Sequence, residues 1–104
     1  MNIDKIELGW KYNKKAIHAK GTKEELRILR EAVSKGVETP YTYDRLSILF
    51  FKEGRIKEAI NVCEKYKKIM DKRLEFRREK GYAEDISSTE KAIIKRLNDL
   101  RSKL

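Results

Sequence analysis

The sequence predicts an all-α fold of about five helices. Apolar residues recur at helical spacing along most of the 104-residue chain, and a charged content of 41% fits helices that each bury one narrow apolar stripe. The five glycines are scattered singly, at positions expected to be helix ends or turns, and the only proline stands where a helix is expected to begin. A chain of this length is expected to form one domain, 1–104.

The first segment, 4–19, is compatible with two structures. Alternation typical of a strand is present at Ile6, Leu8, Trp10 and Tyr12. Helical spacing is present at Ile3, Ile6, Trp10 and Ile17. A helix is expected, because the segment leads through Gly21 into a clear helix and a single strand without a partner would be poorly stabilised.

The second segment, 22–35, predicts a helix with marked ends. Thr22 and Glu25 have the spacing of a capping box, and Gly36 follows where a left-handed C-terminal cap would lie. The apolar face of this helix consists of Leu26, Leu29, Ala32 and Val33.

Residues 40–70 predict two antiparallel helices joined across Gly54. Thr39 can cap the first helix, and Pro40 can occupy its first turn, where the N–H that proline lacks is not needed. The apolar side chains of the first helix are Tyr43, Leu46, Leu49 and Phe50. Those of the second are Ile56, Ala59, Ile60, Cys63, Tyr66, Ile69 and Met70. Neither proline nor glycine occurs between Met70 and Lys80, so the second helix is expected to extend to about residue 79.

Residues 87–104 predict the last helix. Ser87 and Glu90 have the spacing of another capping box. One apolar stripe runs through Ile93, Leu97, Leu100 and Leu104, and Ile94 widens it.

The segment 40–70 resembles the tetratricopeptide repeat, a helix-turn-helix unit of about 34 residues that stacks on copies of itself. The positions that correspond to the family pattern are Tyr43, Leu46, Ser47, Phe50, Ala59, Cys63, Tyr66 and Asp71, with Gly54 at the turn. Leu46 and Ala59 match the pattern, whereas Cys63, Tyr66 and Asp71 depart from it. The resemblance implies a degenerate first repeat at 1–36, a better-matching repeat at 39–80 with an extended second helix, and a capping helix at 87–104.

In that family the first helix of each repeat lines a concave groove that binds a protein partner. The positions that match groove-lining positions are Tyr41, Asp44, Arg45, Ile48, Phe51 and Lys52. The resemblance therefore implies a non-catalytic interaction module that serves as an adaptor, an assembly subunit or a regulator. Asp44 and Ile48 do not match the residues with which some members clamp a C-terminal carboxylate, so that activity is not expected. The alternatives are that Ile48 and Phe51 pack inside the protein, or that apolar surface is covered by self-association, with a homodimer as the leading form.

No catalytic, metal-binding or cofactor-binding residues are expected. His18 is the only histidine and Cys63 the only cysteine, which leaves no pattern for a catalytic triad, a metal cluster or an internal disulfide. Cys63 lies on an apolar stripe and is expected to be a buried packing residue. A small-molecule substrate is not expected. The N-terminal segment lacks the features of a signal peptide and no apolar run is long enough to span a bilayer, so a cytoplasmic location is expected.

The net charge of +9 is concentrated in two blocks and raises nucleic-acid binding as the alternative function. Residues 1–20 hold five basic and two acidic residues, and residues 65–80 hold eight basic and three acidic residues. The predicted basic patch on the second block consists of Lys65, Lys68, Lys72, Arg73, Arg77 and Lys80. Aromatic side chains lie among these cations, as in surfaces that bind unpaired bases. A solvated helix with internal ion pairs is the competing interpretation, because Asp71, Glu75 and Glu79 interrupt the block.

Overall fold

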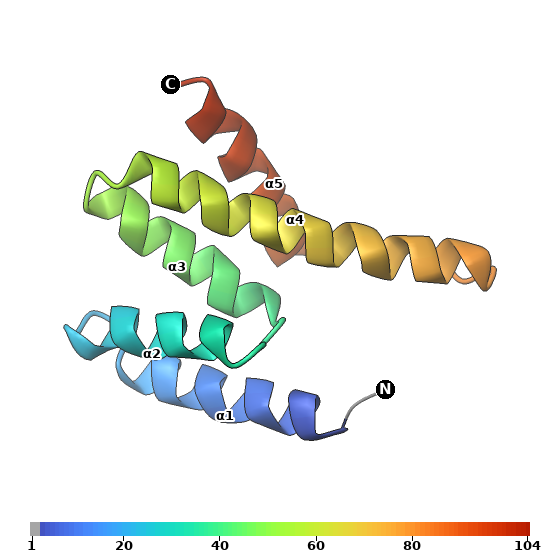
Figure 1. The fold of residues 1–104 in the computed structure, drawn as a ribbon, viewed down its shortest axis with the longest axis horizontal. Helices are drawn as coiled ribbons and strands as arrows, with labels where there is room; N and C mark the ends of the chain where they lie inside the picture. Colours follow the sequence, from blue (N-terminus) through green and yellow to red (C-terminus); the bar gives the residue numbers. More distant parts are fainter. Residues whose placement is uncertain (1–2) are drawn as a thin grey trace.

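The computed structural model describes residues 3–104, which form five α-helices (Figure 1). The helices are α1 (Ile3–His18), α2 (Glu24–Ser34), α3 (Pro40–Lys52), α4 (Ile56–Glu79) and α5 (Ser88–Arg101). No β-strand occurs in this range, so the predicted all-α class is confirmed and segment 4–19 is a helix rather than a strand. Gly54 ends α3 in the left-handed conformation, at φ 74°, which glycine adopts without the strain that a side chain would add.

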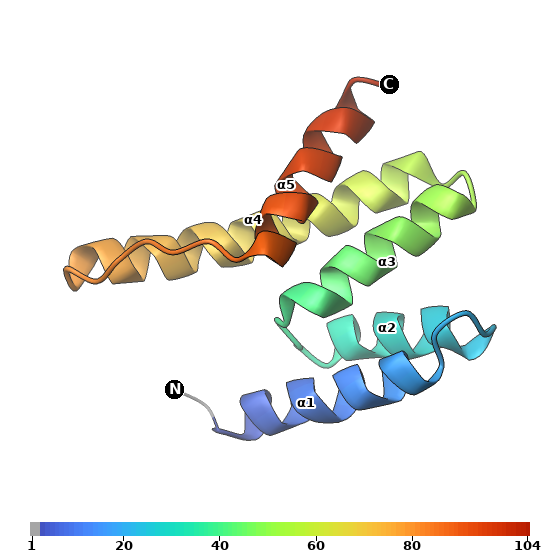
Figure 2. The ribbon, with the colours of Figure 1, turned by 180° about the vertical axis from the view of Figure 1, so that it is seen from behind.

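The helices pack as two hairpins followed by a single helix. α1 pairs with α2 and α3 pairs with α4, while α2 also packs against α3. The last helix, α5, lies across α3 and α4, behind α4 in Figure 1 and in front of it in Figure 2. The molecule is flat, with extents of 42 × 35 × 20 Å, and the second half of α4 projects beyond the other helices (Figure 1).

Most of the core lies where α3, α4 and α5 meet. Tyr43 and Tyr66 form its centre, with ring centroids 5.3 Å apart, and both side chains are buried. The predicted stripe of α5 is confirmed for Ile93, Leu97 and Leu100, which are fully buried. It is wrong for Leu104, which lies beyond the end of the helix and is 74% exposed. A smaller apolar cluster, made of Tyr12, Ala32 and Val37, joins α1 to α2 and to the start of the α2–α3 connection.

α1 buries a small residue in its middle, as α3 does. Gly9 and Ser47 are both buried, and each is followed three residues later by a buried aromatic side chain, Tyr12 in α1 and Phe50 in α3. The expectation that every glycine marks a helix end or turn is therefore wrong for Gly9. A Cβ atom placed on Gly9 would lie 2.8 Å from Thr39 Oγ1, so the missing side chain lets α1 approach the start of α3.

Replacing Gly9 with valine is expected to lower the free energy of unfolding by about 2 kcal/mol, because the added methyl groups meet Thr39 and Val37 in a packed contact. Urea denaturation followed by circular dichroism measures this change. The double variant Gly9→Val/Thr39→Ala is the control and is expected to recover part of the loss. A Gly9→Val variant as stable as the original chain would contradict the close approach.

The two predicted capping boxes have different outcomes. Ser87 Oγ accepts a hydrogen bond from the Glu90 N–H at 3.2 Å, and Glu90 accepts one from the Ser87 N–H at 2.9 Å, so the second box is confirmed. The first box is wrong: Thr22 Oγ1 donates to the carbonyl of Ala19, and α2 begins at Glu24 without a side-chain cap. The side chain of Glu25 is instead held by Arg45 of α3, a partner distant in sequence.

Candidate partner-binding site

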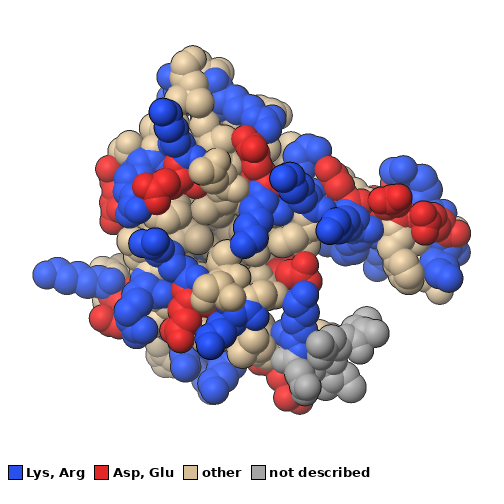
Figure 3. Space-filling view, viewed as in Figure 1, with Lys and Arg blue, Asp and Glu red and all other residues tan. Residues whose placement is uncertain are grey.

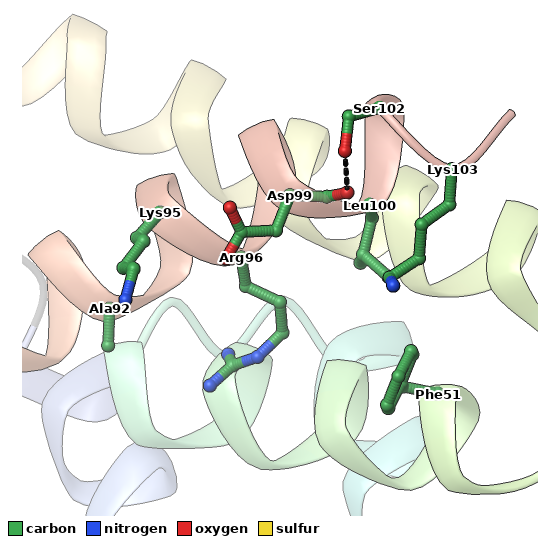
Figure 4. Close-up of a pocket in the computed structure, with 8 residues that line it drawn as sticks. All are labelled: Phe51, Ala92, Lys95, Arg96, Asp99, Leu100, Ser102 and Lys103. Atoms are coloured by element: carbon green, nitrogen blue, oxygen red, sulfur yellow. Dashed lines mark hydrogen bonds between the residues drawn. The ribbon is translucent and has the colours of Figure 1, made fainter.

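The predicted groove residues all lie on α3, and the structure places one of them in a hollow. Phe51 is 44% exposed and lines a hollow of about 530 Å³ between the end of α3 and α5 (Figure 4). The remaining lining residues all belong to α5 or to the residues after it: Ala92, Lys95, Arg96, Asp99, Leu100, Ser102 and Lys103. Two helices that are distant in sequence therefore build this hollow together.

Asp44 borders the hollow through an ion pair with Arg96. Arg96 Nη1 donates to Asp44 Oδ1 at 2.5 Å and to Ser47 Oγ at 3.1 Å. Both partners are half-buried, and the three side chains connect α3 directly to α5. Asp44 thus helps to hold α5 in place, and it neutralises Arg96, the one arginine that lines the hollow.

Arg45 and Tyr41 face α2 rather than the hollow. Arg45 donates two hydrogen bonds to the carboxylate of Glu25, at 2.5 and 3.1 Å, and Glu25 is 1% exposed. Burial alone would raise the pKa of Glu25, but the guanidinium of Arg45 and the N–H of Gly21 outweigh it and hold that pKa below its ordinary value. Tyr41 packs against the main core beside this pair, and burial raises its pKa. These two residues join the two hairpins.

The free charge of the hollow is positive. Lys95 and Lys103 are exposed on α5 and on the residues after it, and Lys52 is exposed at the end of α3. None of the ion pairs among the described side chains involves these three lysines. Asp99 is the only carboxylate among the lining residues. The hollow thus combines an exposed phenyl ring with two lysines and one carboxylate, Asp99, none of which takes part in an ion pair among the described side chains.

The contribution of α5 to this site was missing from the sequence prediction. Ala92, Lys95 and Asp99 recur at helical spacing on the side of α5 opposite the buried stripe of Ile93 and Leu97. That spacing was visible in the sequence. The pattern alone, however, gave no reason to pair this polar side with Phe51.

The predicted basic patch is divided by the structure, because its arginines hold the segment that follows α4. Arg73 donates to both carboxylate oxygens of Glu90, at 2.6 and 3.1 Å, and to the carbonyl of Asp85 at 3.1 Å. Arg77 donates to the carbonyl of Ala83 at 3.3 Å. These bonds fasten residues 80–87 along α4, where Figure 2 shows the chain running back beside the helix.

The remaining cations of that patch are lysines. Lys80 Nζ lies 5.8 Å from the centroid of the Phe76 ring. Lys65, Lys68 and Lys72 are exposed and share one side of α4. Figure 3 shows acidic side chains among the basic ones along this helix. The structure therefore does not bring the six predicted residues together as one continuous cationic surface.

Cys63 is fully buried, and burial raises the pKa of its thiol, as expected for a packing residue. In the described part of the chain no three side chains of His, Cys, Asp or Glu are grouped so that they can hold a metal ion. No helix between residues 3 and 104 has the length and apolarity to cross a membrane. Comparisons with protein-family models, with curated proteins and with solved structures give no match for this chain.

Proposed function

We propose that this protein is a non-catalytic protein-interaction module whose partner docks in the hollow between α3 and α5. The observation that carries this proposal is the exposed ring of Phe51 in a hollow whose lining has two lysines outside any ion pair and only one carboxylate, Asp99. A phenyl ring that remains 44% exposed next to a concave surface offers apolar area to a partner. An adaptor, an assembly subunit and a regulator all fit such a surface.

The chemistry of the hollow favours an acidic segment with one large apolar side chain. The apolar side chain would cover Phe51, and carboxylates beside it would pair with Lys95 and Lys103. Arg96 is already neutralised by Asp44, so it shapes the hollow more than it attracts the partner. Lys95 and Lys103 outnumber Asp99, the one carboxylate of the lining, so a basic segment would fit less well than an acidic one.

The order of the helices supports a tetratricopeptide-like arrangement. Two consecutive helical hairpins are followed by one helix that covers the second hairpin, as in a short repeat array with a cap. In such an array α1, α3 and α5 would be the first helices of their units and would share one face. The hollow lies between two of these three helices, where a repeat protein of this kind presents its groove.

Replacing Phe51 with alanine is expected to weaken binding of selected acidic peptides at least tenfold, because a buried aromatic anchor contributes about 2 kcal/mol or more to an interface. Peptides would be selected from a displayed random library against the full chain, and their affinities measured by fluorescence anisotropy. The matched control is Phe76→Ala, which removes another exposed phenyl ring far along α4.

Selection of acidic peptides that bind the Phe76→Ala variant but not the Phe51→Ala variant supports the proposal. A library that yields no binder, or binders indifferent to Phe51, contradicts it. A third outcome is that Phe51 mediates self-association, so that its replacement dissociates a homodimer. The molecular masses of both variants in solution, measured by sedimentation, distinguish this outcome from the loss of peptide binding. The alternative of nucleic-acid binding by the 65–80 helix has less support, because two of its arginines are occupied by the chain itself.

A further inference from the structure

One long basic stretch of the chain has no acidic residue in it. Residues 8–23 contain five lysines and neither Asp nor Glu, and Glu7 and Glu24 stand at its borders. Glu24 is paired with Arg27 at 2.7 Å and so does not neutralise the stretch. None of the five lysines takes part in an ion pair between described side chains. This differs from α4, whose arginines are bound to carboxylates and carbonyls.

Three of the five lysines, with His18, lie on one side of α1. Lys11, Lys14, Lys15 and His18 stand at positions i, i+3, i+4 and i+7 of the helix, and all four are exposed. Together with Ala19, Thr22, Glu24 and Ile28 they line a hollow of about 640 Å³ between α1 and α2. This basic face therefore places three lysines around a hollow whose one carboxylate, Glu24, is paired with Arg27.

An aromatic side chain borders the basic face. Trp10 is 71% exposed and lies one helical turn before Lys14. It lines a second hollow of about 440 Å³, whose other walls include Asn13, Pro40 and Glu38. A large indole ring left in solvent on the same helix as three lysines, with Lys14 one turn away, is a combination that stacks an unpaired base while ammonium groups contact the neighbouring phosphates.

We propose that α1 binds single-stranded nucleic acid, with Trp10 stacking on a base and Lys11, Lys14 and Lys15 contacting phosphates. This surface is separate from the hollow at Phe51, and the proposal stands independently of the protein partner. An anionic bilayer is the competing anionic ligand. A planar bilayer fits less well, because the Trp10 ring lines a concavity, which a flat surface does not fill. A flexible strand can place one base in that concavity.

The test uses the full chain and the fluorescence of Trp10, which is the only tryptophan. Titration with a 20-residue oligothymidylate at 50 mM salt is expected to quench this fluorescence. Three phosphate contacts predict that the affinity falls about twentyfold between 50 and 200 mM salt, from the slope of about 0.7 per contact for single strands. Measured with a labelled oligonucleotide, Trp10→Ala is expected to weaken binding about tenfold.

The variant Lys11→Glu/Lys14→Glu/Lys15→Glu is expected to abolish binding. The matched control is Lys65→Glu/Lys68→Glu/Lys72→Glu, which makes the same change of net charge on α4. At 200 mM salt, where distant charges are screened, its affinity for the oligonucleotide is expected to stay within about threefold of that of the original chain. All six lysines are surface residues of helices, and circular dichroism checks that both variants are folded.

Three results would overturn the proposal: no quenching at 50 mM salt, equal loss of binding in the two triple variants, or binding to phosphatidylserine vesicles with none to the oligonucleotide. Tighter binding of a duplex than of the single strand would also contradict the proposal, because the bases of a duplex are paired and Trp10 is proposed to stack on an unpaired base. The Phe51→Ala variant is expected to bind the oligonucleotide normally, so failure here and failure of the peptide assay are distinguishable.

Discussion

Replacing Glu90 with alanine is expected to lower the free energy of unfolding by about 3–4 kcal/mol, in the lower part of the range of about 3–5 kcal/mol for breaking a buried ion pair, because Arg73 is partly exposed. The Glu90 carboxylate is 2% exposed. It accepts hydrogen bonds from Arg73 at 2.6 Å, from the Tyr66 hydroxyl at 2.7 Å and from the Ser87 N–H at 2.9 Å. Its loss would leave the Tyr66 hydroxyl buried without an acceptor and remove half of the cap of α5. Urea denaturation at pH 7, followed by circular dichroism, measures the change.

Glu64→Ala provides the matched control for this variant. Glu64 also lies on the α4–α5 side of the molecule, but its side chain is 42% exposed and pairs with Arg101 at 3.4 Å. Surface pairs of this kind contribute little, so a change within about 0.5 kcal/mol is expected. Similar losses for both variants would show that Glu90 is only a surface residue with an incidental partner.

The helices were predictable because each depends on a local pattern. Pro40 and Gly54 mark the ends of α3, and the apolar spacing from Ile56 to Met70 needs only neighbours along one helix. The extension of α4 to Glu79 followed from the lack of any helix breaker. In the fold, the apolar side chains of each helix face the core as their spacing predicts. Local and tertiary preferences therefore agree.

The partners of the charged residues were not predictable, because they come from distant parts of the chain. Glu90 was predicted as a cap for α5, yet Arg73 and Tyr66 reach it from 17 and 24 residues away. Arg45 was assigned to a groove and instead pairs with Glu25 of α2. Counting charged residues along the sequence gives the net charge of a segment. It does not show which of those charges the fold pairs with residues elsewhere in the chain.

The candidate site shows the same limit. Phe51 was predicted to line a groove, and its exposure beside a hollow keeps that prediction open to test. Its neighbours Lys95 and Lys103 come from the segment 87–104, which was predicted only as a capping helix. The Asp44–Arg96 contact helps to fix which side of α5 faces α3, and it joins residues 52 positions apart. Helical spacing alone contains no information about that pairing.

Stability is expected to fall steeply in acid because of Glu90. Burial by itself would raise the pKa of this carboxyl, but hydrogen bonds from Arg73, the Ser87 N–H and Tyr66 outweigh it and lower the pKa from 4.5 to about 2. A lowered folded-state pKa stabilises the fold fully above the unfolded-state value. This contribution is lost as the pH falls from about 4.5 towards 2, and its size is about 3 kcal/mol at about 1.4 kcal/mol per unit.

The measurement is the free energy of unfolding by urea at pH 6, 4, 3 and 2, for the original chain and for Glu90→Gln. Other carboxylates, including Glu25 with its own lowered pKa, and the growing positive charge destabilise both proteins in acid. Glu90→Gln cannot titrate at this position, so the difference between the two proteins isolates Glu90. That difference is expected to be largest at pH 6 and to shrink by about 3 kcal/mol by pH 2. A difference that stays constant with pH would mean that Glu90 has an ordinary pKa and that its bonds to Arg73 and Tyr66 are not maintained.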